Sequence, residues 1–295
     1  MRVVTFSEGD NTRIGVLDRA RSEVVDLARA APGLPLEMRA FIALGDAGLS
    51  EARRALDSGS ARLALARVAL LAPLPRPARN ILCVGKNYRE HAREVQATAI
   101  AGADKDGVPD VPVFFTKWTS SVVGPNAPIP AHLDPTESTD YEGELAVIIG
   151  RGGRGIARAE AMRHVYGYTI VNDVTARRLQ KLHNQWFLGK SIDGFCPMGP
   201  VIVTADEVAD VGALRVQTRV NGEPRQDAYV SDLVFDIPTL IETLARTMTL
   251  EPGDILSTGT PAGVGMGFKP PKFLQKGDVV SVTIEPIGTL ENPVI

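Results

Sequence analysis

The chain has 295 residues, of which 44% are hydrophobic and 23% charged, which is enough for one large domain or a small domain beside a larger one. The net charge of -3 argues against nucleic acid or an anionic membrane as a partner. The two cysteines form no metal-type cluster and no disulfide framework, and no uncharged run reaches the ~20 residues of a membrane span. With no signal-peptide pattern at its start, we expect a cytoplasmic protein.

Residues 1–72 are expected to form a small α/β domain. Short strand-like runs occur at 2–6, 13–17 and 23–27, and Ala/Leu/Arg-rich stretches near 36–44 and 50–58 predict two helices. The Pro-rich segment 74–79 is typical of a linker. We therefore predict a second, larger domain over 73–295.

The pattern from residue 80 onward is one of short strands separated by Gly/Pro turns. Strands are predicted at 140–150, 167–175, 214–221, 255–258 and 279–284, and helices at 89–96, 159–164, 175–185 and 237–249. The segment 97–112 is rich in small residues, a composition found in loops that close over active sites. Because strands outnumber helices, the predicted class is α+β and β-rich.

Three carboxylates occur in two of the strand-like runs. Glu142 and Glu144 alternate along 140–150, and Asp173 lies in 167–175. Residues i and i+2 of a strand face the same side, so the two glutamates should point together. If a neighbouring strand brings Asp173 to the same place, three hard oxygen ligands suit Mg²⁺ or Mn²⁺ better than zinc. The alternative is that the glutamates lie on the solvated face of an edge strand.

A histidine and a glutamate lie three positions apart in the predicted helix 89–96. His91 and Glu94 would be neighbours on one helix face. A carboxylate beside an imidazole orients the ring and raises its basicity, so the pair could serve as a general base that activates water. The alternative is a solvated surface helix with incidental pairing.

Two further segments could contribute to the same chemistry. Lys190 follows an apolar run and a glycine, so it could enter a pocket and stabilise an oxyanion or enolate, or else lie on the surface. The glycines of 257–265 would let backbone N–H groups converge on a carboxylate, with the Thr260 hydroxyl as a further donor, unless the segment is a plain turn. Its glycine spacing matches neither a Walker loop nor a dinucleotide fingerprint.

In combination these segments resemble the fumarylacetoacetate hydrolase family. The resemblance covers residues 73–295 nearly continuously and is carried by 85–91, 140–150, 166–177, 187–191, 196–200 and 258–265. Residues 268–278 resemble the bacterial branch that has an extra N-terminal domain. The resemblance implies a mixed β-sandwich roll and, usually, a homodimer.

The resemblance also implies roles for individual residues. Mg²⁺ or Mn²⁺ is expected on Glu142, Glu144 and Asp173. The catalytic residues are expected to be His91, Glu94 and Lys190. Substrate contacts are expected from Gln180, Thr260 and Lys117.

The sequence departs from the family pattern at two places. Arg178 stands where the family usually has Asp, which affects the expected surroundings of Asp173. Tyr229 and Val230 stand where relatives often carry small polar residues, which affects the expected substrate specificity.

We therefore expect a metal-dependent enzyme that acts on a small 2-oxo acid. Hydrolysis of a C–C bond in an acylpyruvate such as fumarylpyruvate ranks first, with His91 activating water and Lys190 helping to hold the enolate. Oxaloacetate decarboxylation is a close second, and isomerisation of a 2-oxo-enoic diacid needs the same site. The alternative from another class is a catalytically silent, metal-stabilised binding protein.

Overall fold

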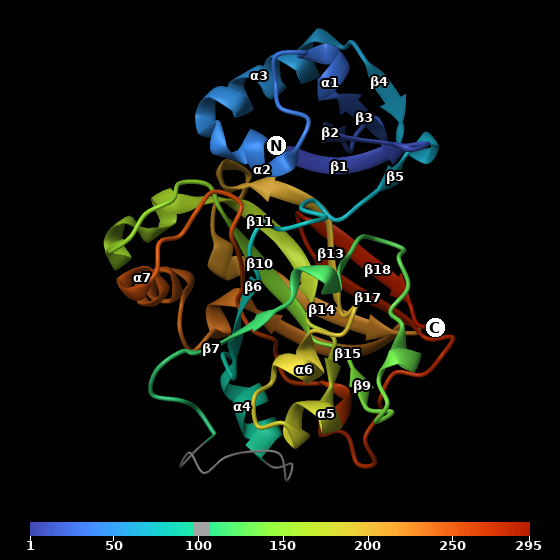
Figure 1. Cartoon of the computed structure of the whole chain (residues 1–295), viewed down its shortest axis with the longest axis vertical. Helices are drawn as coiled ribbons and strands as arrows, with labels where there is room; N and C mark the ends of the chain where they lie inside the picture. Colours follow the sequence, from blue (N-terminus) through green and yellow to red (C-terminus); the bar gives the residue numbers. More distant parts are fainter. Residues whose placement is uncertain (97–106) are drawn as a thin grey trace.

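The computed structural model describes residues 1–96 and 107–295 and has a smaller N-terminal part beside a larger β-rich body (Figure 1). Most of the segment expected to close over the site falls in 97–106, outside the described residues. No helix in the described ranges is long and apolar enough to cross a membrane.

The N-terminal part combines short strands with three helices. Its strands are β1 (Arg2–Glu8), β2 (Asn11–Asp18), β3 (Glu23–Asp26), β4 (Arg62–Ala64) and β5 (Ala69–Leu70). Its helices are α1 (Leu27–Ala30), α2 (Met38–Ala43) and α3 (Gly45–Ser58). The predicted elements are present, although the last helix begins five residues earlier than expected.

A mixed sheet connects this part to the body. In the body it contains β6 (Ile81–Gly85), β7 (Val113–Lys117), β8 (Val122–Val123), β10 (Gly143–Ile149), β11 (Val165–Asn172), β13 (Cys196–Thr204) and β16 (Ile255–Ser257). The strand order is β4-β3-β2-β1-β13-β11-β10-β16-β6-β7, with β5 beside β1 and β8 beside β13. Because β1 pairs with β13, one sheet crosses the expected domain boundary, and a division after residue 72 stays a prediction.

A second, antiparallel sheet packs against the first. It has the order β15 (Glu223–Tyr229), β14 (Arg215–Val220), β17 (Val279–Ile284) and β18 (Gly288–Pro293). A two-stranded ribbon is formed by β9 (Thr139–Asp140) and β12 (Thr175–Ala176). The two sheets account for the β-rich, sandwich-like class expected from the sequence.

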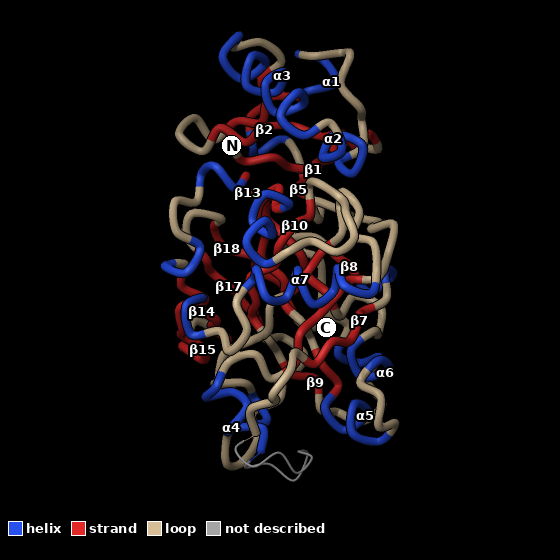
Figure 2. The backbone as a smooth tube through the Cα atoms, turned by 90° about the vertical axis from the view of Figure 1, so that its left-hand side faces the viewer, coloured by secondary structure: helices blue, strands red, loops and turns tan. Residues whose placement is uncertain are grey.

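Within the described residues, the body has four α-helices, and the chain has eight 3₁₀ turns. The helices are α4 (Arg89–Gln96), α5 (Arg177–Leu182), α6 (Phe187–Lys190) and α7 (Ile237–Thr247). The turns are η1 (Leu65–Arg67), which precedes the body, η2 (Thr119–Ser121), η3 (Ala131–Leu133), η4 (Arg158–His164), η5 (Ala205–Glu207), η6 (Val211–Ala213), η7 (Val230–Asp232) and η8 (Gly265–Gly267). Figure 2 shows α4, α5 and α6 at the end of the molecule farthest from the N-terminal part.

Two helix predictions need correction. The segment 159–164 forms the 3₁₀ turn η4 rather than an α-helix. The predicted helix 175–185 is shorter, because Thr175 and Ala176 pair with β9 and the helix begins only at Arg177. Strand pairing therefore overrides the local helical pattern there.

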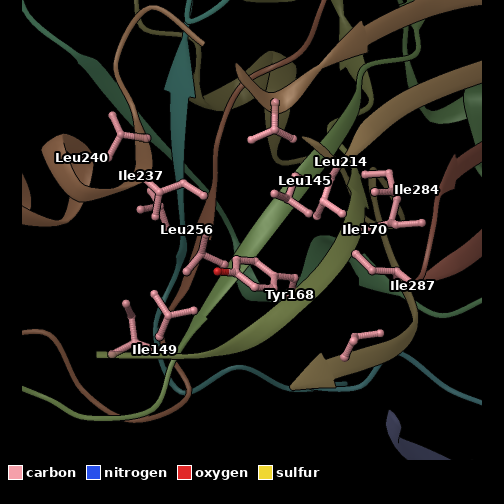
Figure 3. Packing of buried hydrophobic residues seen from close by; sticks show 14 of the residues in the cluster. Leu145, Ile149, Tyr168, Ile170, Leu214, Ile237, Leu240, Leu256, Ile284 and Ile287 are labelled. Atoms are coloured by element: carbon pink, nitrogen blue, oxygen red, sulfur yellow. The ribbon is translucent and has the colours of Figure 1, made fainter. Parts of the chain in front are cut away.

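The central strand β10 explains why its sequence is apolar without alternation. Leu145, Val147 and Ile149 pack on one face, against α7 and the second sheet (Figure 3). Ala146 and Ile148 pack on the other face, in the cluster that includes the helices of the N-terminal part. A strand buried on both faces needs apolar residues at every position. The rigid strand so formed carries the polar residues at its beginning.

Candidate active site

The three carboxylates lie together at the start of β10 and the end of β11. The strands are antiparallel neighbours with Gly143 opposite Asn172, so Glu142 lies beside Asp173. The backbone N–H of Asp173 donates to the Glu142 carbonyl oxygen at 2.8 Å. One oxygen from each of Glu142, Glu144 and Asp173 lies within 4.8 Å of the others. The expected convergence is therefore present, although Glu142 lies one residue before the strand.

The cluster is in the middle of the sheet and is not solvated. β10 has β11 on one side and β16 on the other, so the edge-strand alternative does not apply. A side chain at Gly143 would overlap Thr218 and lie 2.9 Å from Val282 of the second sheet. Glycine between the two glutamates therefore lets the second sheet pack directly behind them.

Buried lysines contact two of the three carboxylates, Glu142 and Asp173. Lys190 Nζ donates to Glu142 Oε2 at 2.6 Å and to Asp173 Oδ2 at 2.7 Å. Lys117 Nζ donates to the other oxygen of Asp173 at 2.6 Å. Since Lys190 is only 2% exposed, the surface-lysine alternative is wrong.

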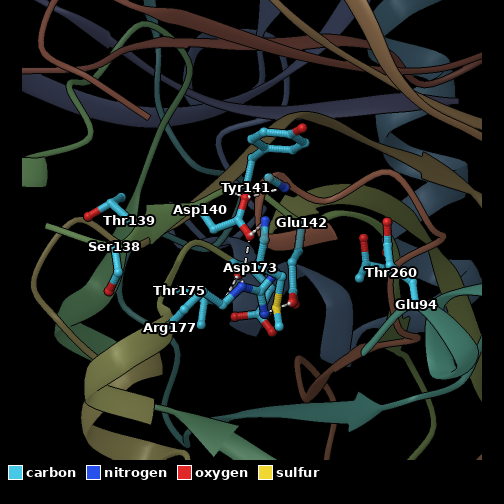
Figure 4. Close-up of polar contacts among 12 residues, drawn as sticks. Glu94, Ser138, Thr139, Asp140, Tyr141, Glu142, Asp173, Thr175, Arg177 and Thr260 are labelled. Carbon is cyan, nitrogen blue, oxygen red and sulfur yellow. Dashed lines mark hydrogen bonds and ion pairs between the residues drawn. The ribbon is translucent and has the colours of Figure 1, made fainter. Parts of the chain in front are cut away.

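A fourth carboxylate extends this network. Arg177 donates through Nη1 to Glu142 Oε1 at 2.5 Å and through Nε to Asp140 Oδ2 at 2.8 Å, as Figure 4 shows. Arg177 is 2% exposed. One buried N–H donor of this network, Arg177 Nη2, has no hydrogen-bond partner among the described residues.

The two glutamates differ in their tendency to ionise. Burial, together with the negative charges of Asp173 and Glu142, raises the pKa of Glu144 well above its usual value. Burial opposes ionisation of Glu142 too, but Lys190 and Arg177 outweigh it and hold that pKa low. A divalent cation among the three carboxylates would relieve the repulsion at Glu144. An all-oxygen, strongly anionic donor set fits a hard ion such as Mg²⁺ or Mn²⁺.

The histidine–glutamate pair lies on α4. His91 Nδ1 is 3.2 Å from Glu94 Oε2, and the backbone N–H of Gly263 donates to Glu94 Oε1 at 3.0 Å. His91 is 5% exposed, which excludes the solvated-helix alternative. A side chain at Gly267 would overlap the Glu94 carboxylate, so this glycine makes room for it.

The glycine-rich segment binds carboxylates of the chain itself. Backbone N–H groups donate from Gly259 to Glu144, from Gly263 to Glu94, and from Gly265 and Met266 to Asp140, at 2.7–3.0 Å. Two of these donors, Gly265 and Met266, converge on one carboxylate, Asp140, whereas Gly259 and Gly263 each reach a different carboxylate of the chain. The Thr260 hydroxyl donates to the Gly143 carbonyl oxygen at 3.0 Å and accepts from Gln226 at 2.7 Å. The segment thus holds the candidate ligand Glu144 in place, together with its neighbours Glu94 and Asp140.

A cavity of about 50 Å³ connects these groups. Its described lining consists of Val84, Gly85, Lys86, His91, Val95, Phe115, Glu142, Glu144, Arg177, Gln180, Trp186, Lys190, Thr260 and Met266. The three other predicted site residues, Glu94, Asp173 and Lys117, contact lining residues or each other but are not part of this lining.

The two departures from the family pattern lie away from the cavity. Arg178 donates to the Thr136 carbonyl oxygen at 2.7 Å and lies over the Phe273 ring. Tyr229 is exposed at the end of β15, and Val230 is buried after it, but neither is among the described residues that line the cavity.

Sequence reasoning did not single out four residues that the structure brings into the site. Asp140 and Arg177 lie inside segments that were recognised, and the i, i+2 spacing of Asp140 and Glu142 was a usable signal. Trp186 precedes Lys190 by one helical turn, which was a weaker signal. Gln226 comes from the second sheet, and its local sequence carries no signal.

Comparison with known proteins gives a consistent classification. Residues 80–295 match the model for the fumarylacetoacetate (FAA) hydrolase C-terminal family. The oxaloacetate tautomerase YisK of Bacillus subtilis is 47% identical over 97% of this chain and 94% of its own. The chain therefore belongs to the fumarylacetoacetate hydrolase family of enzymes.

Two solved structures extend the comparison over the whole chain. A fumarylacetoacetate hydrolase from Exiguobacterium antarcticum is 45% identical, with a TM-score of 0.83, and the match covers 100% of this chain and 99% of that one. A maleylpyruvate hydrolase from Sphingobium sp. SYK-6, in complex with manganese and pyruvate, is 33% identical, with a TM-score of 0.79 and the same coverage. The Glu/Glu/Asp cluster found here could bind metal, and manganese is bound in that relative.

Proposed function

We propose that this protein is a divalent-metal-dependent enzyme that interconverts the enol and keto forms of oxaloacetate or a closely similar 2-oxo diacid. The observation that carries the proposal is one small cavity lined by carboxylates, by the cations Lys190 and Arg177, and by His91. Similarity to an oxaloacetate tautomerase over nearly the whole of both chains supports this reaction over the others that need the same site. The order of preference thus differs from the one based on sequence alone.

Glu142, Glu144 and Asp173 are the residues that would hold Mg²⁺ or Mn²⁺. When bound, the ion would supply a positive charge that favours the enolate form of a 2-oxo acid. Lys117 would keep Asp173 in place by its 2.6 Å hydrogen bond. The choice of this ion class is supported by the all-oxygen donors and by the manganese in the maleylpyruvate hydrolase relative.

The remaining residues would bind the diacid and move one proton. Arg177 lines the cavity and its Nη2 has no hydrogen-bond partner in the described chain, so this group would be available to a substrate carboxylate. His91 directs Nδ1 to Glu94, which leaves Nε2 to exchange a proton with the substrate. Tautomerisation moves a proton between the oxygen on C2 and the carbon C3, so no water is consumed. Gln180 and Thr260 would help orient the bound acid.

The test is the loss of enol absorbance from freshly dissolved enol-oxaloacetate. With Mg²⁺ and the protein present, the enol should decay faster than in buffer with Mg²⁺ alone. Pyruvate is assayed in the same samples, because decarboxylation also removes oxaloacetate. Enol decay at the buffer rate would contradict the proposal.

Hydrolysis of an acylpyruvate is the second candidate. It is supported by the His91–Glu94 pair in the cavity, which could activate water, and by the similarity to maleylpyruvate hydrolase. Pyruvate release from fumarylpyruvate that outpaces oxaloacetate tautomerisation would reverse the order of the two candidates. The homodimer implied by the family resemblance also stays a prediction, which sedimentation equilibrium would test.

A further inference from the structure

One wall of the cavity is aromatic. The indole of Trp186 lies against Gly85, where an added Cβ would overlap Cζ3 and lie 2.7 Å from Cη2. The three atoms nearest to that added Cβ all belong to Trp186. The Phe115 ring meets the indole edge-on, with centroids 5.3 Å apart and planes at 70°. The indole is therefore in contact with both β6 and β7.

The same aromatic wall contacts the buried Lys190. Lys190 Nζ lies 5.0 Å from the centroid of the Phe115 ring, and the backbone N–H of Lys190 donates to the Trp186 carbonyl oxygen at 3.1 Å. One turn of helix thus separates the wall from the ammonium group that contacts the carboxylates. This arrangement limits the space between them, in keeping with a cavity of about 50 Å³.

We infer that Trp186 sets the maximum length of the substrate. With the indole against Gly85, the cavity favours a short 2-oxo acid over one with a longer chain beyond C3. Rejection is steric, because the indole cannot move toward Gly85 without overlap. The inference rests on the proposed function in one respect: it takes the substrate to be a 2-oxo acid.

Two variants test the wall through catalysis. Trp186→Ala should raise the ratio of kcat/KM for fumarylpyruvate to that for oxaloacetate by about tenfold or more, the range in which a pocket discriminates by size. Trp186→Phe should give an intermediate ratio. Trp118→Ala is the matched control, since Trp118 is 51% exposed and is not part of the described lining, so it should keep the wild-type ratio. A wild-type ratio in Trp186→Ala would overturn the inference.

Binding tests the wall even if neither substrate is turned over. Calorimetry with Mg²⁺ compares oxalate, which is short, with 2-oxoglutarate, which is one carbon longer than oxaloacetate. Wild type should prefer oxalate, and Trp186→Ala should reduce that preference by about tenfold. An unchanged preference would overturn the inference. A reduced preference without any oxaloacetate tautomerisation would support the wall and contradict only the proposed function.

A substitution on the opposite side of the contact gives an independent check. Gly85→Ala should displace the indole and weaken binding of both acids at least tenfold, because the new Cβ overlaps it. Adding Trp186→Ala should restore the binding of Gly85→Ala to within about twofold of Trp186→Ala alone. Equal loss in the single and double variants would mean that Gly85 acts on something other than the indole, and would contradict the inference.

Discussion

The two polar walls of the cavity differ in how they are built. On the sheet wall, Glu142 and Asp173 are fixed by lysine and arginine side chains that are as buried as the carboxylates themselves. On the helix wall, Glu94 is the described residue that orients His91 by a hydrogen bond, and Glu94 in turn accepts from one backbone N–H group of the glycine-rich segment. The sheet wall therefore holds several charged groups in place within the fold, whereas the helix wall presents one histidine–glutamate pair.

Because of this difference, substitutions on the sheet wall should lower the free energy of unfolding, whereas substitutions on the helix wall should lower mainly the rate of turnover. Removing one member of a buried ion pair leaves its partner uncompensated, which destabilises proteins by about 3–5 kcal/mol. Removing the His91 imidazole breaks no hydrogen bond to the three candidate ligands in the described chain, so it should lower the free energy of unfolding by less. Measuring both stability and function of a variant therefore shows whether the substituted residue belongs to the sheet wall or to the helix wall.

The largest effect is expected for Glu142→Ala. Lys190 keeps Asp173 and Arg177 keeps Asp140, so the free energy of unfolding should fall by about 3 kcal/mol, the lower end of the range for a broken buried ion pair. Mn²⁺ binding, followed by electron paramagnetic resonance at a temperature where the variant is folded, should be lost.

The control for Glu142 is Glu160→Ala, because Glu160 forms an exposed ion pair with Arg163. Exposed pairs contribute about 0–1 kcal/mol, so this variant should unfold like wild type and bind Mn²⁺ normally. Equal stability of the Glu142 and Glu160 variants in urea titrations would show that the sheet wall is not the charged framework described here.

His91→Ala should have the second-largest effect, and only on turnover. Loss of a general acid–base group should lower kcat for oxaloacetate tautomerisation about 10²- to 10⁴-fold. Mn²⁺ affinity and the urea midpoint should stay near wild type, since His91 contacts none of the three candidate ligands through a hydrogen bond in the described chain. His183→Ala, at an exposed position, is the control. A His91 variant with full kcat would remove the histidine from the mechanism.

Gly267→Ala should have the smallest of the three effects. Its Cβ would overlap the Glu94 carboxylate, which is the mobile end of a side chain, so Glu94 should shift and His91 should lose its orientation. We expect kcat to fall by up to about 10²-fold with little loss of stability. Gly33→Ala is the control, because nothing lies within 4 Å of a Cβ there. If Glu94→Ala has full activity while Gly267→Ala does not, the effect does not act through Glu94.

Much of the sheet wall could be predicted from the sequence because it depends on local rules. Strand alternation placed Glu142 and Glu144 on one side, and the resemblance added Asp173 from the neighbouring strand. Likewise, the helical spacing of His91 and Glu94 predicted their contact, which is observed at 3.2 Å.

The remaining features depend on contacts between distant segments. Lys117 reaches Asp173 from a strand 56 residues away, and Gln226 reaches Thr260 from the second sheet. The local sequence around Lys117 or Gln226 does not indicate which distant residue its side chain will contact. The glycine-rich segment shows the same limit: its conformation was predictable, but which carboxylates its N–H groups meet is decided by packing.

We propose that this cavity requires a hard divalent cation to act on a 2-oxo diacid. The most direct measurement is the rate of enol-oxaloacetate decay with protein freed of metal by a chelator and then titrated with Mg²⁺ or Mn²⁺. We expect no acceleration by the metal-free protein, and a recovery of the rate that saturates at one ion per chain. Full acceleration in excess chelator would contradict it.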